Sequence, residues 1–375
     1  MGNIEFNTQN VTRKLRISNS STNWISNTQT PVQIVQAGYV QDLLVYLNGA
    51  TTTTTNAVVP DVYGGPWGVI GNFQVNSNVQ ASIINLSGIA AAWFRDLILG
   101  LEHMGNTLDT NLVSEVNSAA VTSVYSIPAA AGAGTLTLYY WLPLGQKINT
   151  LDGMIGIWDL QDPSIQVTLL YTPNTPTAST PFSIQEGATS TGVGLFTQTA
   201  STGCTVATPT MLITRVMFDP PVDPRDDPDF GYVSSIYEET WQTGMAGAKV
   251  LNWRALANSG YITRLLFSVF DSAVPGGIPD TQGPGSNFIN FTVGNNAPVY
   301  VETIQEFRAR SSIEIGHQMP QGVFYIDFLG QDLTMQNVLD TFIAGNIQLQ
   351  MNLNAALGAT PSGKVVRQMI QAIQQ

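Results

Sequence analysis

The 375-residue sequence contains three pairs of similar segments, and their order is the same in the two halves of the chain. The first pair shares Gly-Tyr before an apolar run, the second shares Asn-Phe, and the third shares a tyrosine four positions before Leu-Gly-Gln. The pairs are 38–45 with 260–267, 72–73 with 287–288, and 140–146 with 325–331, at offsets of 222, 215 and 185. This collinear self-similarity predicts a duplicated fold. Because one hydrophobic core seldom serves so long a chain, each half is expected to form its own domain.

After the third pair, both halves repeat the order strand, loop, helix, strand. Apolar residues at period two indicate strands, and a period of 3.6 indicates helices. In the second half, a helical stripe covers 338–343, and apolar residues alternate with polar ones from 347 to 353. The expected strand, helix and strand are 138–142, 150–160 and 165–169 in the first half, and 323–326, 338–343 and 347–353 in the second.

The fall in offset from 215 to 185 predicts that the first half carries 30 more residues between its second and third anchors. Residues 89–104 are expected to lie in this insert. Its apolar residues have helical spacing: Trp93, Leu97, Ile98 and Leu101. We expect a helix that packs on its own domain, with a contact between subunits as the alternative.

The composition predicts an all-β chain. Only 11% of the residues are charged, and threonine, serine, asparagine, glutamine and glycine are abundant. Such a composition is typical of many short strands joined by polar turns and is unlike a helical enzyme.

Residues 219–229 contain four prolines and five aspartates. Proline disrupts regular structure, so this segment is expected to be a stiff connector. Four of its carboxylates offer oxygen ligands for Ca²⁺ but lack the spacing and glycine of a calcium loop, so a solvated connector is favoured over a metal site. These are Asp223, Asp226, Asp227 and Asp229. The expected division is an N-terminal arm at 1–30, a first domain at 31–214, the connector at 215–232, a second domain at 233–360 and a C-terminal helix at 361–375.

The C-terminal segment places its apolar residues on one face of a helix. They are Val365, Val366, Met369, Ile370 and Ile373. The helix is too short to span a membrane, and it is expected to dock on its own domain, a neighbour or a lipid surface.

The net charge of -12 argues against contact with nucleic acid, because neutralising phosphates requires many cations and the chain has only 14. Arg13, Lys14 and Arg16 form a basic cluster. It is expected to be a solvated arm, with a contact to anionic lipid or a neighbouring subunit as the alternative. A single Cys204 excludes an intrachain disulfide, and the first residues lack the pattern of a signal peptide, so a cytosolic protein is expected.

The usual residues of catalysis are scarce. His103 and His317 lie in different halves and are too few for a metal site. Residues 358–364 spell the phosphate-binding pattern G-x-x-x-x-G-K, but Val365 stands where a Ser or Thr hydroxyl would bind Mg²⁺. We therefore expect no enzymatic activity and no cofactor.

Two segments resemble tectivirus major capsid proteins. Residues 129–144 read Ala-Ala-Ala-Gly-Ala-Gly-Thr-Leu-Thr-Leu-Tyr-Tyr-Trp-Leu-Pro-Leu, and Tyr-Tyr-Trp-x-Pro-Leu is the most specific part. Residues 320–325, Pro-Gln-Gly-Val-Phe-Tyr, are similar to the matching stretch of the second domain in that family. Both segments lie where the duplication places equivalent strands.

The resemblance implies two tandem eight-stranded jelly-roll β-sandwiches, to which the sequence adds short helices in loops and the C-terminal helix. It implies that three copies form a pseudo-hexagonal capsomer in the icosahedral shell of a phage with an internal membrane, assembled in the host cytoplasm. The implied partners are the other subunits of the homotrimer, neighbouring capsomers, and penton and minor membrane-associated capsid proteins. The residues expected to contact the inner membrane or a neighbour are Arg13, Lys14, Arg16, Lys364 and Arg367. The family's membrane-lying N-terminal helix is not expected here, because the N-terminal arm is short.

Two other functions fit an all-β chain of this kind. One is a spike or adhesin with two β-sandwiches that binds host carbohydrate. The other is a jelly-roll glycoside hydrolase, for which Glu238 and Glu239 are the paired carboxylates. Adjacent strand residues point to opposite faces, so these two do not form a catalytic pair by themselves. A shell-building protein is the favoured interpretation.

Overall fold

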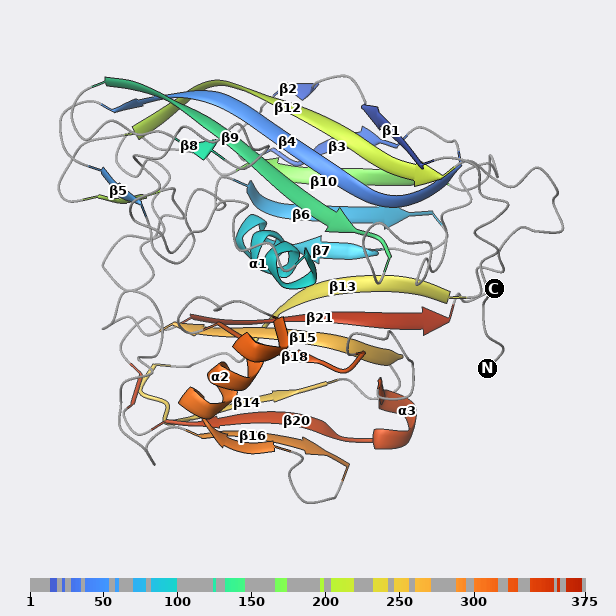
Figure 1. Ribbon diagram of the computed structural model, residues 1–375, viewed down its shortest axis with the longest axis vertical. Coiled ribbons are helices and arrows are strands. Elements are labelled where there is room, and N and C mark those ends of the chain that lie inside the picture. The colour runs from blue at the N-terminus through green and yellow to red at the C-terminus, as the bar shows by residue number, and fades with distance from the viewer. Residues whose placement is uncertain are drawn as a thin grey trace, which may run out of the picture. The chain divides into compact units, whose positions relative to one another are not determined.

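The structure of the protein is a computed structural model, drawn as a ribbon in Figure 1. It describes residues 14–18, 22–23, 28–34, 38–53, 58–60, 70–78, 82–99, 124–125, 132–145, 166–173, 196–198, 204–218, 232–241, 246–255, 260–270, 288–294, 300–315, 323–329, 338–353, 356–357 and 362–372. The chain forms two compact units. Unit 1 comprises Met1–Ile184, Gly192–Ile236 and Ala372–Gln375, and unit 2 comprises Gln185–Thr191 and Tyr237–Gln371.

Unit 1 contains two facing sheets and a short two-stranded ribbon. The strands are β1 (Lys14–Ser18), β2 (Thr22–Asn23), β3 (Thr30–Gln33), β4 (Tyr39–Thr53), β5 (Val58–Pro60), β6 (Ile70–Ser77), β7 (Ile84–Leu86), β8 (Val124–Tyr125), β9 (Gly132–Pro143), β10 (Val167–Pro173), β11 (Phe196–Gln198) and β12 (Cys204–Phe218). One sheet has the order β1-β12-β4-β9-β8, with β2 also paired to β12, and the other has the order β7-β6-β10-β3. The sheets pack face to face, because the rings of Phe73 on β6 and Tyr140 on β9 lie 4.9 Å apart.

Unit 2 also contains two sheets. Its strands are β13 (Tyr232–Thr240), which enters the unit at Tyr237, β14 (Val250–Arg254), β15 (Tyr261–Phe270), β16 (Phe288–Val293), β17 (Tyr300–Thr303), β18 (Val323–Asp327), β19 (Leu339–Asp340), β20 (Ile347–Asn352) and β21 (Ser362–Ala372). The strand orders are β13-β21-β15-β18, with β19 also paired to β15, and β14-β20-β16-β17. The core between them is rich in aromatic side chains, with Phe267 stacked on Phe324 at 5.2 Å.

The two units share one strand order. The sheet β1-β12-β4-β9 of unit 1 corresponds to β13-β21-β15-β18 of unit 2, and β3-β10-β6-β7 corresponds to β14-β20-β16-β17. Corresponding strands hold the same place in the chain and in the sheet. This agreement is what a duplicated sequence predicts.

Strand pairing fixes the residue equivalences. Val45 pairs with Tyr140, and Phe267, 222 positions after Val45, pairs with Phe324; all four side chains are fully buried. The first anchor offset of 222 is therefore correct. The counterpart of Tyr140 is Phe324, so the third offset is 184, and the predicted match to Tyr325 was wrong by one residue. A shift of one residue matters because it moves a side chain to the opposite face of the sheet.

The helix predicted as an insert is present in both units. α1 (Gly88–Leu99) follows β7, and α2 (Ile304–Ile315) follows β17, with starts 216 positions apart. The predicted placement of this helix in the insert was therefore wrong. The extra residues of the first half fall between α1 and β9, where the structure describes only β8. Trp93 and Phe94 are buried, and α1 contacts β6, β7 and β9, so it packs on its own unit, as the sequence predicted.

A reciprocal capping box begins α2. The Thr303 backbone N–H donates to Glu306 Oε2 at 3.0 Å, and the Glu306 N–H donates to Thr303 Oγ at 3.2 Å. The backbone hydrogen bond from Thr303, followed by the hydroxyl hydrogen bond, lowers the pKa of Glu306. This contribution to stability is present above the ordinary pKa of a glutamate and is lost as the pH falls through the lowered value.

Replacing Thr303 with alanine is expected to lower the free energy of unfolding by about 1 kcal/mol, because loss of the Thr303 hydroxyl leaves an N–H of the first turn without its hydrogen-bond partner. Urea denaturation monitored by circular dichroism measures this change. Ser312→Ala is the control, since the Ser312 hydroxyl only donates back to the Arg308 carbonyl in mid-helix. Equal midpoints for Thr303→Ala and the wild type would contradict the role of the cap.

Residues 362–372 form the strand β21, so the predicted C-terminal helix was wrong. β21 pairs with β15 over nine residues, from Tyr261 opposite Ile370 to Phe270 opposite Ser362. Its apolar residues face both sides of the sheet: Val365 and Met369 belong to the core of unit 2, whereas Val366 and Ile370 do not. A strand that is buried on both faces has no alternation, and a short apolar run of this kind also fits a helical face.

The other predicted elements have different outcomes. Strands occur at 138–142, 323–326 and 347–352, and β10 contains most of the strand predicted at 165–169. The predicted helix at 338–343 is a short strand, β19, followed by the single turn α3 (Thr341–Ala344). The predicted helix at 150–160 lies outside the described residues.

The ends predicted for the first domain also change. Residues 14–18 and 22–23 are strands of unit 1, so the predicted arm at 1–30 contains sheet structure. β12 continues to Phe218, so the predicted connector at 215–232 begins with strand. Its remainder before β13 lies outside the described residues. Within the described part of the chain, no helix is long and apolar enough to cross a membrane.

Candidate assembly surfaces

Two of the predicted contact cations form ion pairs inside unit 2. Lys364 Nζ lies 3.0 Å from Glu238 Oε1, and Arg367 Nε pairs with Glu239 Oε1. These pairs join the neighbouring strands β13 and β21. Trp253 Nε1 donates to Glu239 Oε2 at 3.2 Å and so links this carboxylate to the opposite sheet. Lys364 keeps 46% of its side chain exposed, whereas Arg367 is only 9% exposed and faces inward.

Glu238 and Glu239 therefore belong to two separate ion pairs, each with a structural role. A glycosidase requires two carboxyl groups that face one scissile bond. Here each carboxylate has its own cation, and the Glu238 side chain is only 8% exposed. This geometry suits a structural role, in which the ion pairs hold the first and last strands of unit 2 together, better than acid-base catalysis.

The N-terminal basic residues lie on or next to β1. The backbone of Lys14 pairs with Phe218 and that of Arg16 with Val216, so both residues belong to the strand β1 beside β12. Arg13 lies outside the described residues. The sequence does contain a signal for this strand, because charged and apolar residues alternate from Lys14 to Ile17. The predicted arm did not take account of it.

The remaining sequence candidates cannot be placed. Asp223, Asp226, Asp227 and Asp229 lie outside the described residues, as do His103 and His317. Among the residues that the structure describes, no group of three or more His, Cys, Asp or Glu side chains could hold a metal ion.

The single turn α3 presents two apolar side chains to solvent. Phe342 is 57% exposed and Ile343 is 85% exposed. Asp340 caps the turn, accepting hydrogen bonds from the N–H groups of Phe342 at 2.8 Å and Ile343 at 3.3 Å. Thr341 is buried and donates its hydroxyl to the Gly260 carbonyl at 2.7 Å. The turn is thus anchored by the hydrogen bonds of its cap and by its hydrogen bond to the residue that precedes β15.

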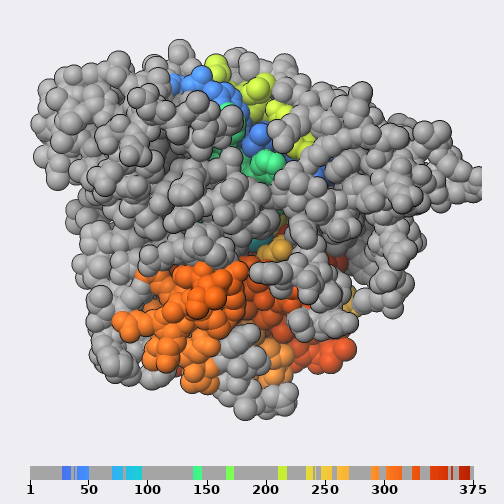
Figure 2. Space-filling view, viewed as in Figure 1, coloured from blue at the N-terminus to red at the C-terminus, as the bar shows by residue number. Residues whose placement is uncertain are grey.

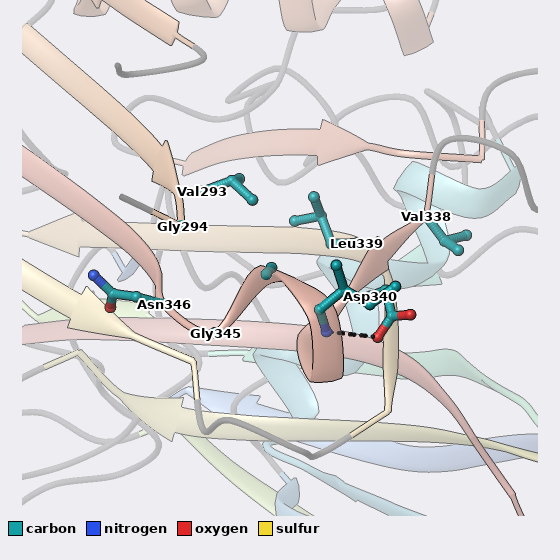
Figure 3. Close-up of a pocket in the computed structure, with 9 residues that line it drawn as sticks. Val293, Gly294, Val338, Leu339, Asp340, Gly345 and Asn346 are labelled. Carbon is teal, nitrogen blue, oxygen red and sulfur yellow. Dashed lines mark hydrogen bonds between the residues drawn. The ribbon is translucent and has the colours of Figure 1, made fainter. Parts of the chain in front are cut away.

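Beside α3 lies a hollow of about 740 Å³, drawn in Figure 3. Its lining is mostly aliphatic and backbone: Val293, Gly294, Val338, Leu339, Asp340, Ile343, Ala344, Gly345 and Asn346. Asp340 is the only ionisable residue in the lining, and its carboxylate accepts the capping hydrogen bonds. The hollow therefore suits apolar contact rather than catalysis.

The helix α2 gives unit 2 a second exposed surface, part of the orange region in Figure 2. Ile313 is 81% exposed on it. Around it the surface is charged, because Arg310 pairs with Glu302 at 3.2 Å and with Glu314 at 2.9 Å. Burial opposes the charge of Arg310, but these glutamates outweigh that effect and raise its pKa.

The fold matches solved structures of viral capsids over nearly the whole chain. The similar structures include the STIV MCP, with a TM-score of 0.62 and 13% identity, covering 96% of this chain and 97% of that chain. The PBCV-1 virus capsid matches with a TM-score of 0.57 and 12% identity over 96% and 94%. The Faustovirus major capsid protein matches with a TM-score of 0.57 and 10% identity over 96% and 91%.

No family model matches the sequence, and no curated protein matches it. The structural likeness nevertheless spans both units in a single alignment. The chain has the mostly β fold of viral major capsid proteins.

Proposed function

We propose that the chain is the major capsid protein of a tectivirus-like, membrane-containing icosahedral phage, and that its role is structural rather than enzymatic. The likeness to capsid proteins over 96% of the chain carries this proposal. The internal ion pairs of Glu238 and Glu239 favour it over a glycoside hydrolase.

In this proposal the two units are tandem eight-stranded jelly rolls. Each unit has four corresponding strands in each sheet, and its first strand lies beside its last. That arrangement supports the proposal, because a jelly roll has eight strands in two Greek keys. The first jelly roll then begins with β1, the Asp- and Pro-rich segment after Phe218 is a connector, and the second ends with β21.

Duplication gives a physical reason for trimers. Three copies of a chain with two similar sandwiches present six similar flanks, so one protein can tile a hexagonal lattice through heterologous contacts. The proposed partners are two further copies, neighbouring capsomers, and penton and minor membrane-associated capsid proteins in a virion assembled in the host cytoplasm.

The proposed contact with an inner membrane or a neighbour involves Arg13, Lys14, Arg16 and Lys364. Lys14 and Arg16 lie two positions apart in β1, and Lys364 keeps nearly half of its side chain exposed. Cations so placed attract anionic headgroups by about 1 kcal/mol each. Arg367 supports this group indirectly, since its ion pair with Glu239 anchors β21.

The purified chain is expected to form a compact trimer with a hexagonal outline. Size-exclusion chromatography with light scattering measures the mass, for which one copy contributes 40.4 kDa, and negative-stain images measure the outline. A stable monomer that binds glycans would overturn the capsid proposal in favour of a spike or adhesin with two β-sandwiches.

A further inference from the structure

The strand β14 lies at the edge of its sheet in unit 2. It pairs with β20 on one side, from Val250 opposite Asn352 to Arg254 opposite Gln348, and no described strand pairs with its other side. Figure 1 shows β14 beside β20. An edge strand that is neither covered nor interrupted is a template for the addition of another strand.

The hydrogen bonds between β14 and β20 show which backbone groups of β14 face outward. The Leu353 N–H donates to the Lys249 carbonyl at 2.7 Å. At the other end of β14, the Ala255 N–H donates to the Ile347 carbonyl at 3.0 Å. Opposite residues of an antiparallel ladder alternate between hydrogen-bonded and non-hydrogen-bonded pairs. Every second residue from Lys249 to Ala255 therefore bonds to β20, and the residues between them point their backbone groups to the other side.

These outward residues are Val250, Asn252 and Arg254, and we call them the β14 edge. Their side chains are exposed, with Val250 at 41%. The alternate residues Leu251 and Trp253 are buried in the core of unit 2. A strand can therefore be added at the β14 edge without displacing a core side chain.

The equivalent edge of unit 1 is protected by a proline. In β3, which corresponds to β14, the Ile34 N–H donates to the Val167 carbonyl at 2.9 Å and so holds the place of Ala255. Three residues before these two donors, β3 has Pro31 and β14 has Asn252. Proline has no N–H and protects an edge against added strands. Unit 1 therefore lacks an outward N–H that unit 2 keeps.

The charges around the β14 edge indicate the chemistry of a partner. Lys249 and Arg254 stand at its two ends, both are exposed, and no described carboxylate pairs with either. Other cations of unit 2 form ion pairs with carboxylates of the same unit: Arg264, Arg310, Lys364 and Arg367. In a chain with 26 acidic and 14 basic residues, two cations that remain for solvent favour a partner with carboxylates.

The same cations disfavour the pairing of two β14 strands. An antiparallel pair centred on Asn252 would gather Lys249 and Arg254 of both copies along one short seam. Like charges brought together in this way oppose association. The β14 edge is therefore better suited to a different chain than to its own copy.

We infer that the β14 edge binds an extended, acidic peptide segment of a different protein, which joins the sheet as an added strand. Main-chain hydrogen bonds supply the affinity in this kind of recognition, and side chains supply the specificity. Here Lys249 and Arg254 supply the preference for carboxylates. The inference is independent of the proposed capsid function, because it follows from the edge geometry and charge of unit 2.

The probe is a fluorescein-labelled synthetic peptide in which glutamate alternates with threonine, added to the intact chain. Fluorescence anisotropy measures its dissociation constant, and hydrogen–deuterium exchange locates it. The N–H groups of Val250 and Arg254 are expected to exchange more slowly when the peptide is bound. Two control peptides are expected to bind about tenfold more weakly: one has lysine in place of glutamate, and the other is N-methylated at every residue.

Two substitutions test the edge itself. Asn252→Pro removes an outward N–H and none that bonds to β20, and it is expected to weaken binding of the glutamate peptide about tenfold. Arg254→Gln is expected to weaken binding about threefold. Ile313→Glu changes the net charge by the same amount at an exposed residue of α2 and is expected to leave binding unchanged. Circular dichroism checks that each variant is folded.

Absence of binding by the glutamate peptide, or equal binding of all three peptides, would overturn the inference. So would wild-type affinity in folded Asn252→Pro; if that variant does not fold, the peptides and Arg254→Gln still decide. Slow exchange of the Val250 and Arg254 N–H groups without peptide, in a chain that self-associates, would assign the edge to a second copy and overturn the inference as well. The capsid proposal is tested separately, by the mass and outline of the assembled chain.

Discussion

Replacing Phe267 with alanine is expected to lower the free energy of unfolding of unit 2 by about 4 kcal/mol. The Phe267 side chain is fully buried and joins three other aromatic rings. Its ring centroid lies 5.2 Å from that of Phe324, 5.4 Å from Trp241 and 5.7 Å from Phe307. The substitution removes a large apolar side chain and leaves a cavity that the surrounding rings cannot fill.

Urea denaturation of the purified chain measures this loss. Phe267→Leu retains most of the buried volume and is expected to lose less than half as much. Val301→Ala is the surface control, because Val301 is 60% exposed and its truncation is expected to change stability by less than about 0.5 kcal/mol. A loss for Phe267→Ala no greater than that for Val301→Ala would show that this cluster does not form the core of unit 2.

The sequence predicted the duplication because one anchor contains a backbone constraint. Gly38 and Gly260 both adopt positive φ, at 61° and 118°, immediately before β4 and β15. Glycine is favoured in this region, so it marks the same point of the fold in both halves. The offset of 222 taken from these glycines was correct.

The third predicted match was wrong by one residue because it contains no such backbone constraint. Leu138, Tyr140, Trp141 and Leu142 are all buried in β9, as are the residues from Val323 to Ile326 in β18. When both faces of a strand are buried, the hydrophobic pattern does not distinguish them, and a sequence match cannot fix the register. The same ambiguity produced the wrong helix at the C-terminus.

The helix α2 was missed although its start is visible in the sequence. Thr303-Ile304-Gln305-Glu306 is a capping-box pattern, and Ser87 holds the equivalent place before α1, where its hydroxyl accepts from the Ala90 N–H at 3.2 Å. Ser87 and Thr303 are 216 positions apart, as the two helices are. A search of both halves for equivalent helix caps would have predicted α2 as well as α1, and so would have assigned the helix to both halves rather than to the insert.

The candidate surfaces were harder to predict, since exposure depends on tertiary contacts. Phe342 and Ile343 belong to an apolar stripe that suggested a packed helix, yet both point into solvent. Tyr46 and Tyr139 lie on different strands, 93 positions apart, and only the register of β4 with β9 brings their rings together.

Replacing Gly260 with alanine is expected to cost about 4 kcal/mol of unfolding free energy, for two reasons that add together. Its φ of +118° is one that residues with a Cβ rarely adopt, and such strain costs about 1–3 kcal/mol. A Cβ at this position would also lie 2.5 Å from the Ile370 carbonyl oxygen, which is backbone of the paired strand β21 and cannot rotate away. Either the pairing of β15 with β21 opens or Gly260 moves. If it moves, its two hydrogen bonds with the Thr341 hydroxyl, at 2.7 and 3.0 Å, are disturbed as well.

Gly345→Ala separates the two causes. Gly345 caps α3 at a φ of +67°, and a Cβ there would meet no atom within 4 Å, so only the backbone strain of about 1 kcal/mol is expected. Thermal and urea denaturation of both variants measure the difference. If Gly260→Ala were no more destabilising than Gly345→Ala, then β21 would not approach Gly260 closely, and the pairing of the last strand beside β15 would be wrong. A larger loss for Gly260→Ala supports β21 as a strand, because a C-terminal helix would place no carbonyl at that position.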